Sequence, residues 1–386
     1  MGERVGRSRS ASSMSALALY LTLSAFSSSA ATTLPAPSNT STAFTFTYDA
    51  ASGSPATTLP APSFSVRKVQ AIHYPADNRT YAYADIVNFS DPFYPVSYSS
   101  EVGVFSSPDG FTQWTYHGIV VPRGPPGAWD SDGIASPGAA VAADGVTVLV
   151  GYAGEHSPSG GNNRGIGLAT APHPLGPFTK SASPVASPAE MCGGSGRCDD
   201  VVMEARRGAV HLYFSVKNSD RPSSCPVDHC IRHVATSDSG RTWSNSTIVL
   251  SRRGTMETFE GRWFPALRGG VGGMILVTDG GAANTALSCF ISAPGSSSDD
   301  DSSMLQFVPA SPDVLLTHPA ANATAPTEGM WAPAFGRGQV AFIPGRGGRV
   351  MGVSYSLWTG QGVPTPHDPD HKWLGYTHTV FKLALV

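Results

Sequence analysis

Acidic residues stand directly before apolar segments at several places in this sequence. Asp132 precedes the segment 133–152, Asp199 and Asp200 lead into the segment 201–215, and Glu260 begins the segment 260–278. Where such segments are neighbouring strands, the carboxylates at their starts can meet. Like-charge repulsion then raises the pKa of one carboxyl group while another stays ionised. An acid and a base in one site need that difference, so Glu260, Asp200 and Asp132 are the candidate catalytic residues.

Aromatic and polar residues beside these carboxylates are candidates for ligand binding. An indole ring offers a flat stacking surface, although core packing explains each tryptophan equally well. Arg262 would hold a hydroxyl or a carboxylate, or it is a surface charge. Histidines such as His73 are also common in cores and turns. The candidate binding residues are Trp129, Arg262, Trp263, Trp331, His73 and Glu328.

The composition excludes several classes of protein. The 386 residues include 42 glycines and 32 prolines, and only 14% are charged, which is typical of a turn-rich chain without long amphipathic helices. The formal net charge is -3, and lysines and arginines are scattered singly. Since no basic stripe is present to neutralise phosphates, we expect no nucleic-acid partner. We expect a monomer.

The first 65 residues differ in composition from the remainder. Arginines at the start, an apolar run from Met14 to Phe26 and small residues up to Ala30 predict a signal peptide over residues 1–30. The run is too short to span a bilayer. Residues 31–65 are rich in Pro, Ser and Thr and predict a disordered linker. Secretion fits the five Asn-x-Ser/Thr sequons, at Asn39, Asn78, Asn88, Asn245 and Asn322, and the alternative is an organelle lumen.

The five cysteines suit an oxidising compartment. Cys192 with Cys198 and Cys225 with Cys230 would close two short loops, which leaves Cys289 over. A zinc site around His229, Cys230 and His233 is the competing interpretation, but the cysteine spacings match no standard zinc pattern. We therefore predict disulfides and no metal site.

A repeat governs the chain from residue 66 onward. Short strands followed by a Pro/Asp/Gly turn each lead to an aromatic residue, and these anchors recur at an interval of about 64 residues, at Trp114, Phe178, Trp243 and Phe307. Apolar strand pairs lie upstream of each anchor, with a fifth pair from Trp331 to Tyr355 and a closing strand from Tyr376 to Leu385. The period predicts a five-bladed β-propeller of four-stranded antiparallel blades over residues 66–386. An irregular β-sandwich is the alternative.

Short motifs resemble those of the five-bladed propeller glycosidases, that is, glycoside hydrolase family 43 and the related arabinanase, xylosidase and invertase group. The matching pieces are Ile166–Phe178 with its Gly-Pro-aromatic turn, Asp200 leading into an apolar strand, and Glu260-Gly261. The resemblance implies that Asp200 tunes pKa and orientation, that Glu260 is the general acid, and that glycosidic bonds are cleaved with inversion. It also implies a carbohydrate substrate and no cofactor, with a calcium ion on the axis in some relatives.

One position departs from that family. The family's base is an Asp-Pro at the start of the first blade, whereas this chain reads Val69–Pro75 there without a carboxylate. Asp132 is the preferred substitute, followed by Asp130 and Glu328. A carbohydrate-binding propeller without activity is therefore the main alternative.

A sialidase is the remaining enzyme class to weigh. Ser237–Trp243 closely matches the Asp-box turn of sialidases, and Ser107–Gly110 is a weaker copy. These turns indicate propeller blades rather than a substrate. Arg164, Arg262 and Arg268 do not obviously supply the arginine triad of a sialidase, so a glycosidase with a carboxylate pair is favoured.

Overall fold

The structure is a computed structural model, and its described residues all lie in the unit Ser41–Val386. They are residues 46–48, 54–55, 64–88, 100–155, 164–187, 191–192, 197–217, 225–227, 229–252, 259–267, 271–279, 287–292, 304–309, 340–346, 350–358 and 376–385. The predicted signal peptide, residues 1–30, falls outside this set. Among the described residues, no helix has the length and hydrophobicity needed to cross a membrane.

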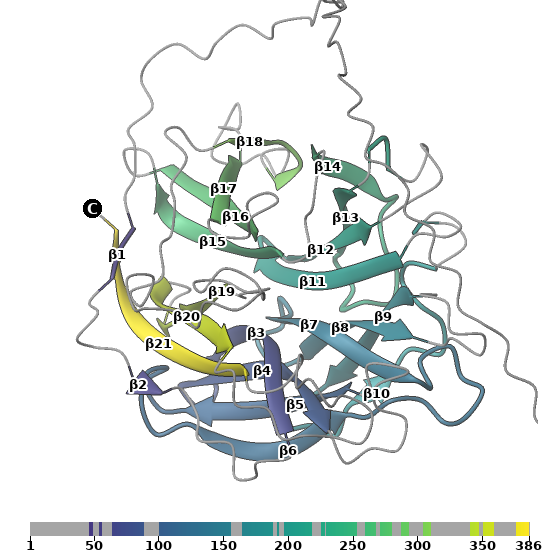
Figure 1. Cartoon of the computed structure of the whole chain (residues 1–386), viewed down its shortest axis with the longest axis horizontal. Helices are drawn as coiled ribbons and strands as arrows, with labels where there is room; N and C mark the ends of the chain where they lie inside the picture. The colour runs from purple at the N-terminus through teal and green to yellow at the C-terminus, as the bar shows by residue number, and fades with distance from the viewer. Residues whose placement is uncertain are drawn as a thin grey trace, which may run out of the picture. The chain divides into compact units, whose positions relative to one another are not determined.

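Four antiparallel sheets of four strands each follow one another along the chain (Figure 1). In each sheet, strands adjacent in sequence pair with one another, so the chain runs from a first strand outward to a fourth. Blade one is β3 (Phe64–Tyr74), β4 (Arg79–Asn88), β5 (Ser100–Ser107) and β6 (Thr115–Val121); blade two is β7 (Gly133–Val141), β8 (Val148–Glu155), β9 (Arg164–Ala171) and β10 (Thr179–Lys180). Blade three is β11 (Arg197–Arg206), β12 (Ala209–Lys217), β13 (His229–Thr236) and β14 (Thr247–Arg252); blade four is β15 (Phe259–Leu267), β16 (Val271–Asp279), β17 (Leu287–Ser292) and β18 (Phe307–Pro309).

A fifth sheet combines strands from both ends of the chain. Its order is β1 (Phe46–Tyr48), β21 (Tyr376–Leu385), β20 (Val350–Trp358) and β19 (Val340–Pro344), and β2 (Ser54–Pro55) also pairs with β21. The count of five four-stranded blades is therefore wrong: four blades have that form, and this sheet has five strands. The difference arises because two short strands within the predicted linker add to β21.

The first strands of the sheets form a closed series of contacts. β3 contacts β7, β7 contacts β11, β11 contacts β15, and β19 contacts both β15 and β3. The early residues of these strands therefore come together although they are far apart in sequence. The fold is an all-β propeller with four-stranded antiparallel blades.

Each aromatic anchor packs at the junction between its own sheet and the preceding one. Phe178 lies against a core cluster shared by blades one and two, Trp243 against one shared by blades two and three, and Phe307 against one shared by blades three and four. Trp114 packs where blade one meets β19. The repeat interval therefore reflects one interblade contact per sheet. Burial of these aromatic side chains stabilises the packing of neighbouring blades.

Two Asp-centred turns join third strands to fourth strands. The Asp109 carboxylate accepts hydrogen bonds from the backbone N–H groups of Phe111 and Thr112 at 2.8 and 2.7 Å. Asp238 accepts from the backbone N–H of Thr242 at 2.9 Å. Burial opposes ionisation of Asp109, but these bonds outweigh it and lower its pKa to about 2. Both turns are structural, as the sequence predicted.

Disulfides join Cys192 to Cys198 and Cys225 to Cys230. Both predicted pairings are confirmed. Because Cys230 is committed to a disulfide, it is excluded as a zinc ligand, and the remaining cysteine, Cys289, lies on β17.

Candidate active site

Glu260, the second residue of β15, is a buried carboxyl group, and only 3% of the residue is exposed. Among the described residues, no side chain donates a hydrogen bond to its carboxyl oxygens, and the backbone N–H of the adjacent Gly261 acts to lower its pKa. Burial raises its pKa to about 8, against the opposing charges of Lys68 and Arg262. At neutral pH the group is therefore protonated, which is the state that a general acid requires.

Lys68 lies among the carboxylates at the early ends of the first strands. It occupies an irregularity in β3 between Val66 and Val69 and is 1% exposed. Its ammonium group donates a hydrogen bond to the carbonyl of Val201 on β11 at 2.6 Å. Burial lowers its pKa, and the charges of four carboxylates oppose this, namely Asp200, Glu260, Asp199 and Asp85. Lys68 is thus the common neighbour of the two predicted carboxylates.

Asp200 stands at a β-bulge of β11 with a φ of 40°, a left-handed conformation that is uncommon for a residue other than glycine. Its carboxylate accepts a hydrogen bond from Lys217 on β12 at 2.6 Å and contacts the Ser215 hydroxyl at 3.4 Å. Backbone strain of this kind persists only where the surroundings hold it. Here the ion pair with Lys217 fixes the carboxylate, and the bulge turns it out of the regular ladder.

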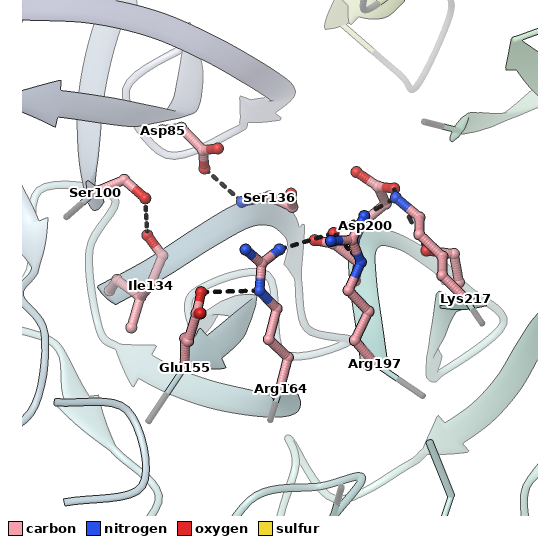
Figure 2. Close-up of polar contacts among 11 residues, drawn as sticks. Asp85, Ser100, Ile134, Ser136, Glu155, Arg164, Arg197, Asp200 and Lys217 are labelled. Atoms are coloured by element: carbon pink, nitrogen blue, oxygen red, sulfur yellow. Dashed lines mark hydrogen bonds and ion pairs between the residues drawn. The ribbon is translucent and has the colours of Figure 1, made fainter. Parts of the chain in front are cut away.

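Asp199 belongs to an ion-pair network that joins blades two and three (Figure 2). Arg164 on β9 contacts the carboxylates of Glu155 and Asp199, each at 2.9 Å. Lys217 lies 3.4 Å from the same Asp199 carboxylate. Burial acts to raise the pKa of Asp199, but Lys217, Arg164 and Arg197 hold it well below its usual range. Asp199 therefore joins the two blades through several basic residues, whereas the ion pair of Asp200 is with Lys217.

Asp85 is a further buried carboxylate of this cluster that the sequence did not reveal. It lies on β4, is 2% exposed, and accepts a hydrogen bond from the backbone N–H of Ser136 on β7 (Figure 2). Ser136 has a φ of 51° at an irregularity of its strand. We define the carboxylate cluster as Lys68, Asp85, Asp199, Asp200 and Glu260.

Asp132 and Asp130 lie before β7 and have different surroundings. Asp130 is buried and bonded to the Lys180 ammonium at 2.8 Å and the Tyr152 hydroxyl at 3.0 Å, so it is held as a structural ion pair. Asp132 is half-buried, and its carboxylate accepts a hydrogen bond from the Ser131 hydroxyl at 3.1 Å. Of the two, Asp132 is the more accessible to water.

His73 lies near the end of β3, and Arg262 is the fourth residue of β15. Both line a cavity of about 290 Å³ whose remaining wall comes from the later residues of β3, β7, β11 and β19. Arg262 donates a hydrogen bond to the carbonyl of Ala71 at 3.2 Å. Neither Asp200 nor Glu260 lines this cavity, although Arg262 is two residues from Glu260 and its charge acts to lower the pKa of that carboxyl group.

The described tryptophans have packing partners. Trp129 stacks on Tyr152 with ring centroids 5.9 Å apart and planes at 10°. Trp263 carries the guanidinium of Arg206 over its ring at 3.2 Å from the centroid and packs against the core. One face of each ring is thus already used. Glu328 and Trp331 lie outside the described residues.

The cluster does not fit an axial calcium ion. Lys68 and Lys217 already supply positive charge beside Asp199 and Asp200, whereas Ca²⁺ needs six to eight oxygen ligands. Within the ranges that the structure describes, no group of three or more His, Cys, Asp or Glu residues is arranged to hold a metal. We derive no step through a metal.

Comparisons with known proteins detect a likeness in structure alone. No protein-family model matches the chain, and no curated protein does. A family 117 glycoside hydrolase of the marine bacterium Zobellia galactanivorans superposes with a TM-score of 0.55 at 16% identity, covering 88% of this chain and 90% of that one.

Two further solved structures give the same picture. An endo-arabinase from Bacteroides thetaiotaomicron gives a TM-score of 0.52 at 14% identity, with 85% and 97% coverage. A GH43_1 enzyme from Xanthomonas citri gives 0.56 at 13%, with 86% and 89% coverage. At these identities the likeness establishes the fold, and the chain is a β-propeller similar to glycoside hydrolases of families 43 and 117.

Proposed function

We propose that the protein is a glycoside hydrolase in which Glu260 is the proton donor. This proposal rests on the buried Glu260 carboxyl group, whose pKa burial raises to about 8, in the same cluster as the bulge-held Asp200, which accepts a hydrogen bond from Lys217. Glycosidases use two carboxyl groups, one that protonates the leaving oxygen and one that acts on water or on the sugar. The similarity in fold to glycoside hydrolases supports this class of reaction.

In the proposed step, the Glu260 proton passes to the glycosidic oxygen as the bond from that oxygen to the anomeric carbon breaks. A water molecule attacks the anomeric carbon from the opposite face, and Asp132 accepts the proton that the water loses. Asp132 suits this role better than Asp130 because Lys180 and Tyr152 occupy the latter. Asp200, fixed by Lys217, orients Glu260 and holds negative charge beside the developing positive charge of the sugar.

A binding protein without activity is the second candidate, and Lys68 is the observation that favours it. Its ammonium group lies in the carboxylate cluster, where a positive charge opposes an oxocarbenium-like transition state. In this alternative the cluster binds a carbohydrate and leaves it intact.

The decisive measurement is hydrolysis of aryl arabinoside, xyloside, galactoside and fructoside substrates. We expect turnover by the parent protein and a loss of at least about a hundred-fold in Glu260→Gln and in Asp132→Asn. Azide should restore turnover in Asp132→Asn if that residue activates water. Full activity of Glu260→Gln would refute the assignment of the acid, and carbohydrate binding without turnover would establish the alternative.

Two further proposals concern the fifth sheet and the location of the protein. We propose that the fifth sheet acts as a fifth blade, since β19 contacts both β15 and β3. We also propose an extracellular location, which the two disulfides and the carbohydrate substrate support.

A further inference from the structure

A cavity whose lining includes neither Asp200 nor Glu260 lies among the first strands of the five sheets. This distal cavity, of about 290 Å³, receives residues from all five first strands; the residues used below are Ile72, His73, Ala139, Met203, Glu204 and Arg262. On β3 and β11 these residues come three to five positions after Lys68 and Asp200. At a rise of about 3.3 Å per residue, the cavity lies roughly 10–16 Å further along those strands.

Gln70 lies on β3 between Lys68 of the carboxylate cluster and Ile72 of the distal cavity. It is fully buried on β3, and its carboxamide oxygen accepts hydrogen bonds from the backbone N–H groups of Ala139 at 2.7 Å and Met203 at 3.0 Å. Its amide nitrogen donates to the carbonyl of Met203 at 3.1 Å. The Gln70 side chain is thus bonded to both β7 and β11.

Arg262 brings a buried positive charge to the cavity wall. Only 7% of the residue is exposed. Its guanidinium donates to the carbonyl of Ala71 at 3.2 Å and lies 3.5 Å from the Glu204 carboxylate, and these contacts use only part of its N–H donors. Burial raises the pKa of Glu204, so this carboxyl group is protonated more readily. When protonated, it no longer balances the positive charge of Arg262. The wall therefore favours an anion.

Two more arginines add positive charge near the cavity. Arg346 is exposed and comes two residues after the lining residue Pro344. Burial is the main cause that lowers the pKa of His73, and the charge of Arg346 lowers it further. The charge of Arg206 acts to lower the pKa of Glu204, against the effect of burial. Asp77 opposes Arg346 at His73, so the positive groups outnumber the negative ones.

We propose that the distal cavity binds a sugar acid, that is, a hydroxylated carboxylate of monosaccharide size, as a site separate from the carboxylate cluster. Arg262 pairs with the ligand carboxylate through two N–H donors. His73 and Glu204 exchange hydrogen bonds with ligand hydroxyls, and Ile72, Ala139 and Met203 contact its C–H surface. Such a mixture of one guanidinium, two polar groups and an apolar wall suits a sugar acid better than inorganic phosphate, which needs several donors.

Calorimetric titration of the full chain with D-glucuronate and D-glucose tests the charge requirement. We expect glucuronate to bind at least about ten-fold more tightly than glucose, because only its carboxylate meets the buried guanidinium. Equal affinities, or no binding of glucuronate, would overturn the proposal.

Ala205 offers a matched pair of variants because it lines the cavity and is exposed. Ala205→Glu introduces a negative charge at the mouth, whereas Ala205→Gln introduces the same volume without charge. We expect the first to weaken glucuronate binding by about ten-fold relative to the second. Equal effects of the two substitutions would contradict an anion site.

Three variants locate the binding site along the axis. Arg346→Ser should weaken glucuronate binding about two- to five-fold, and Arg241→Ser, which removes an exposed arginine of the β13–β14 turn, should not. Asp200→Asn should leave glucuronate affinity unchanged. Loss of binding in Asp200→Asn would move the site to the carboxylate cluster and refute a separate cavity, whatever the outcome of the hydrolysis assays.

Discussion

Glu260 links the chemistry of the candidate site to the stability of the fold. A carboxyl group with an ordinary pKa of 4.5 when unfolded and about 8 when folded binds its proton more tightly in the folded state. Its contribution to stability is therefore complete below pH 4.5 and is lost as pH rises through 8. A residue that serves as a proton donor at neutral pH makes the protein less stable in alkali.

Glu260→Gln should remove this pH dependence. We expect the free energy of unfolding of the variant to exceed that of the parent by an amount that grows between pH 5 and pH 9, by on the order of 4 kcal/mol. Urea denaturation of both proteins at the two pH values measures it. Most other titrating groups contribute equally in both proteins, whereas Lys68 loses the effect of the Glu260 charge in the variant. A difference that stays constant from pH 5 to pH 9 would mean that the Glu260 carboxyl group ionises normally.

Lys68→Met tests the electrostatic coupling within the cluster. The ammonium group of Lys68 lowers the pKa of Glu260, so its removal should raise that pKa further, while Lys68→Arg, which keeps the charge, should change it less. Carbon-13 NMR of labelled glutamate side chains follows the titration. An unchanged pKa in Lys68→Met would show that the two groups do not interact.

At the scale of elements, the blades are joined by a repeated hydrogen bond. The Tyr83 hydroxyl on β4 donates to the carbonyl of Pro174 at 2.8 Å, and the Tyr213 hydroxyl on β12 donates to the carbonyl of Met304 at 3.1 Å. Each tyrosine also meets the aromatic anchor of the following blade edge to face, Phe178 and Phe307 respectively. The same contact therefore recurs two blades apart.

Tyr83→Phe and Tyr213→Phe should each lower the free energy of unfolding by about 1–2 kcal/mol, because a buried carbonyl loses its donor while the ring stays in place. The double variant should lose close to the sum, since the sites share no partner. Chemical denaturation of the three variants tests this. A change of under a few tenths of a kcal/mol in either single variant would mean that the bond does not join the blades.

The elements were more predictable than the site. The anchor interval identified four blades because every blade repeats one interblade contact, and Trp114 and Phe307 mark its first and last copies. The three-residue strand β1 is too short to carry a pattern of its own and lay within the predicted linker. A lysine among apolar residues, such as Lys68, gives no sequence signal for burial, since its partners come from other blades.

Predictions for individual site residues depended on where along a strand each residue falls. Glu260 and Asp200 lie at early positions and share the cluster around Lys68. Arg262 is only two residues beyond Glu260, yet it lines the distal cavity. The sequence shows that a residue belongs to a first strand, but not how far along the axis its side chain extends.

At the scale of the whole molecule, the fifth sheet depends on both ends of the chain. β1 pairs with β21 in register from Phe46 opposite Leu385 to Tyr48 opposite Leu383. An unpaired β21 would expose a row of backbone hydrogen-bonding groups at the sheet edge. The N-terminal strand covers that edge without a covalent link.

Removal of residues 1–49 should therefore destabilise the protein, whereas removal of residues 1–40 should not. We expect the midpoint of thermal unfolding to fall by several degrees in the longer truncation only, because β1 and its ladder bonds are lost. Scanning calorimetry compares the two. Equal midpoints would mean that β1 adds nothing to ring closure.

The pairing of β1 with β21 also dictates an order of events during biosynthesis. Residues 46–48 leave the ribosome long before their partner, residues 376–385. While the blades between them fold, β1 has been synthesised but its partner β21 has not yet left the exit tunnel, so the fifth sheet stays incomplete. Residues 376–385 must be synthesised before this sheet can form, and any chaperone that binds the nascent chain has to protect the early segment until then.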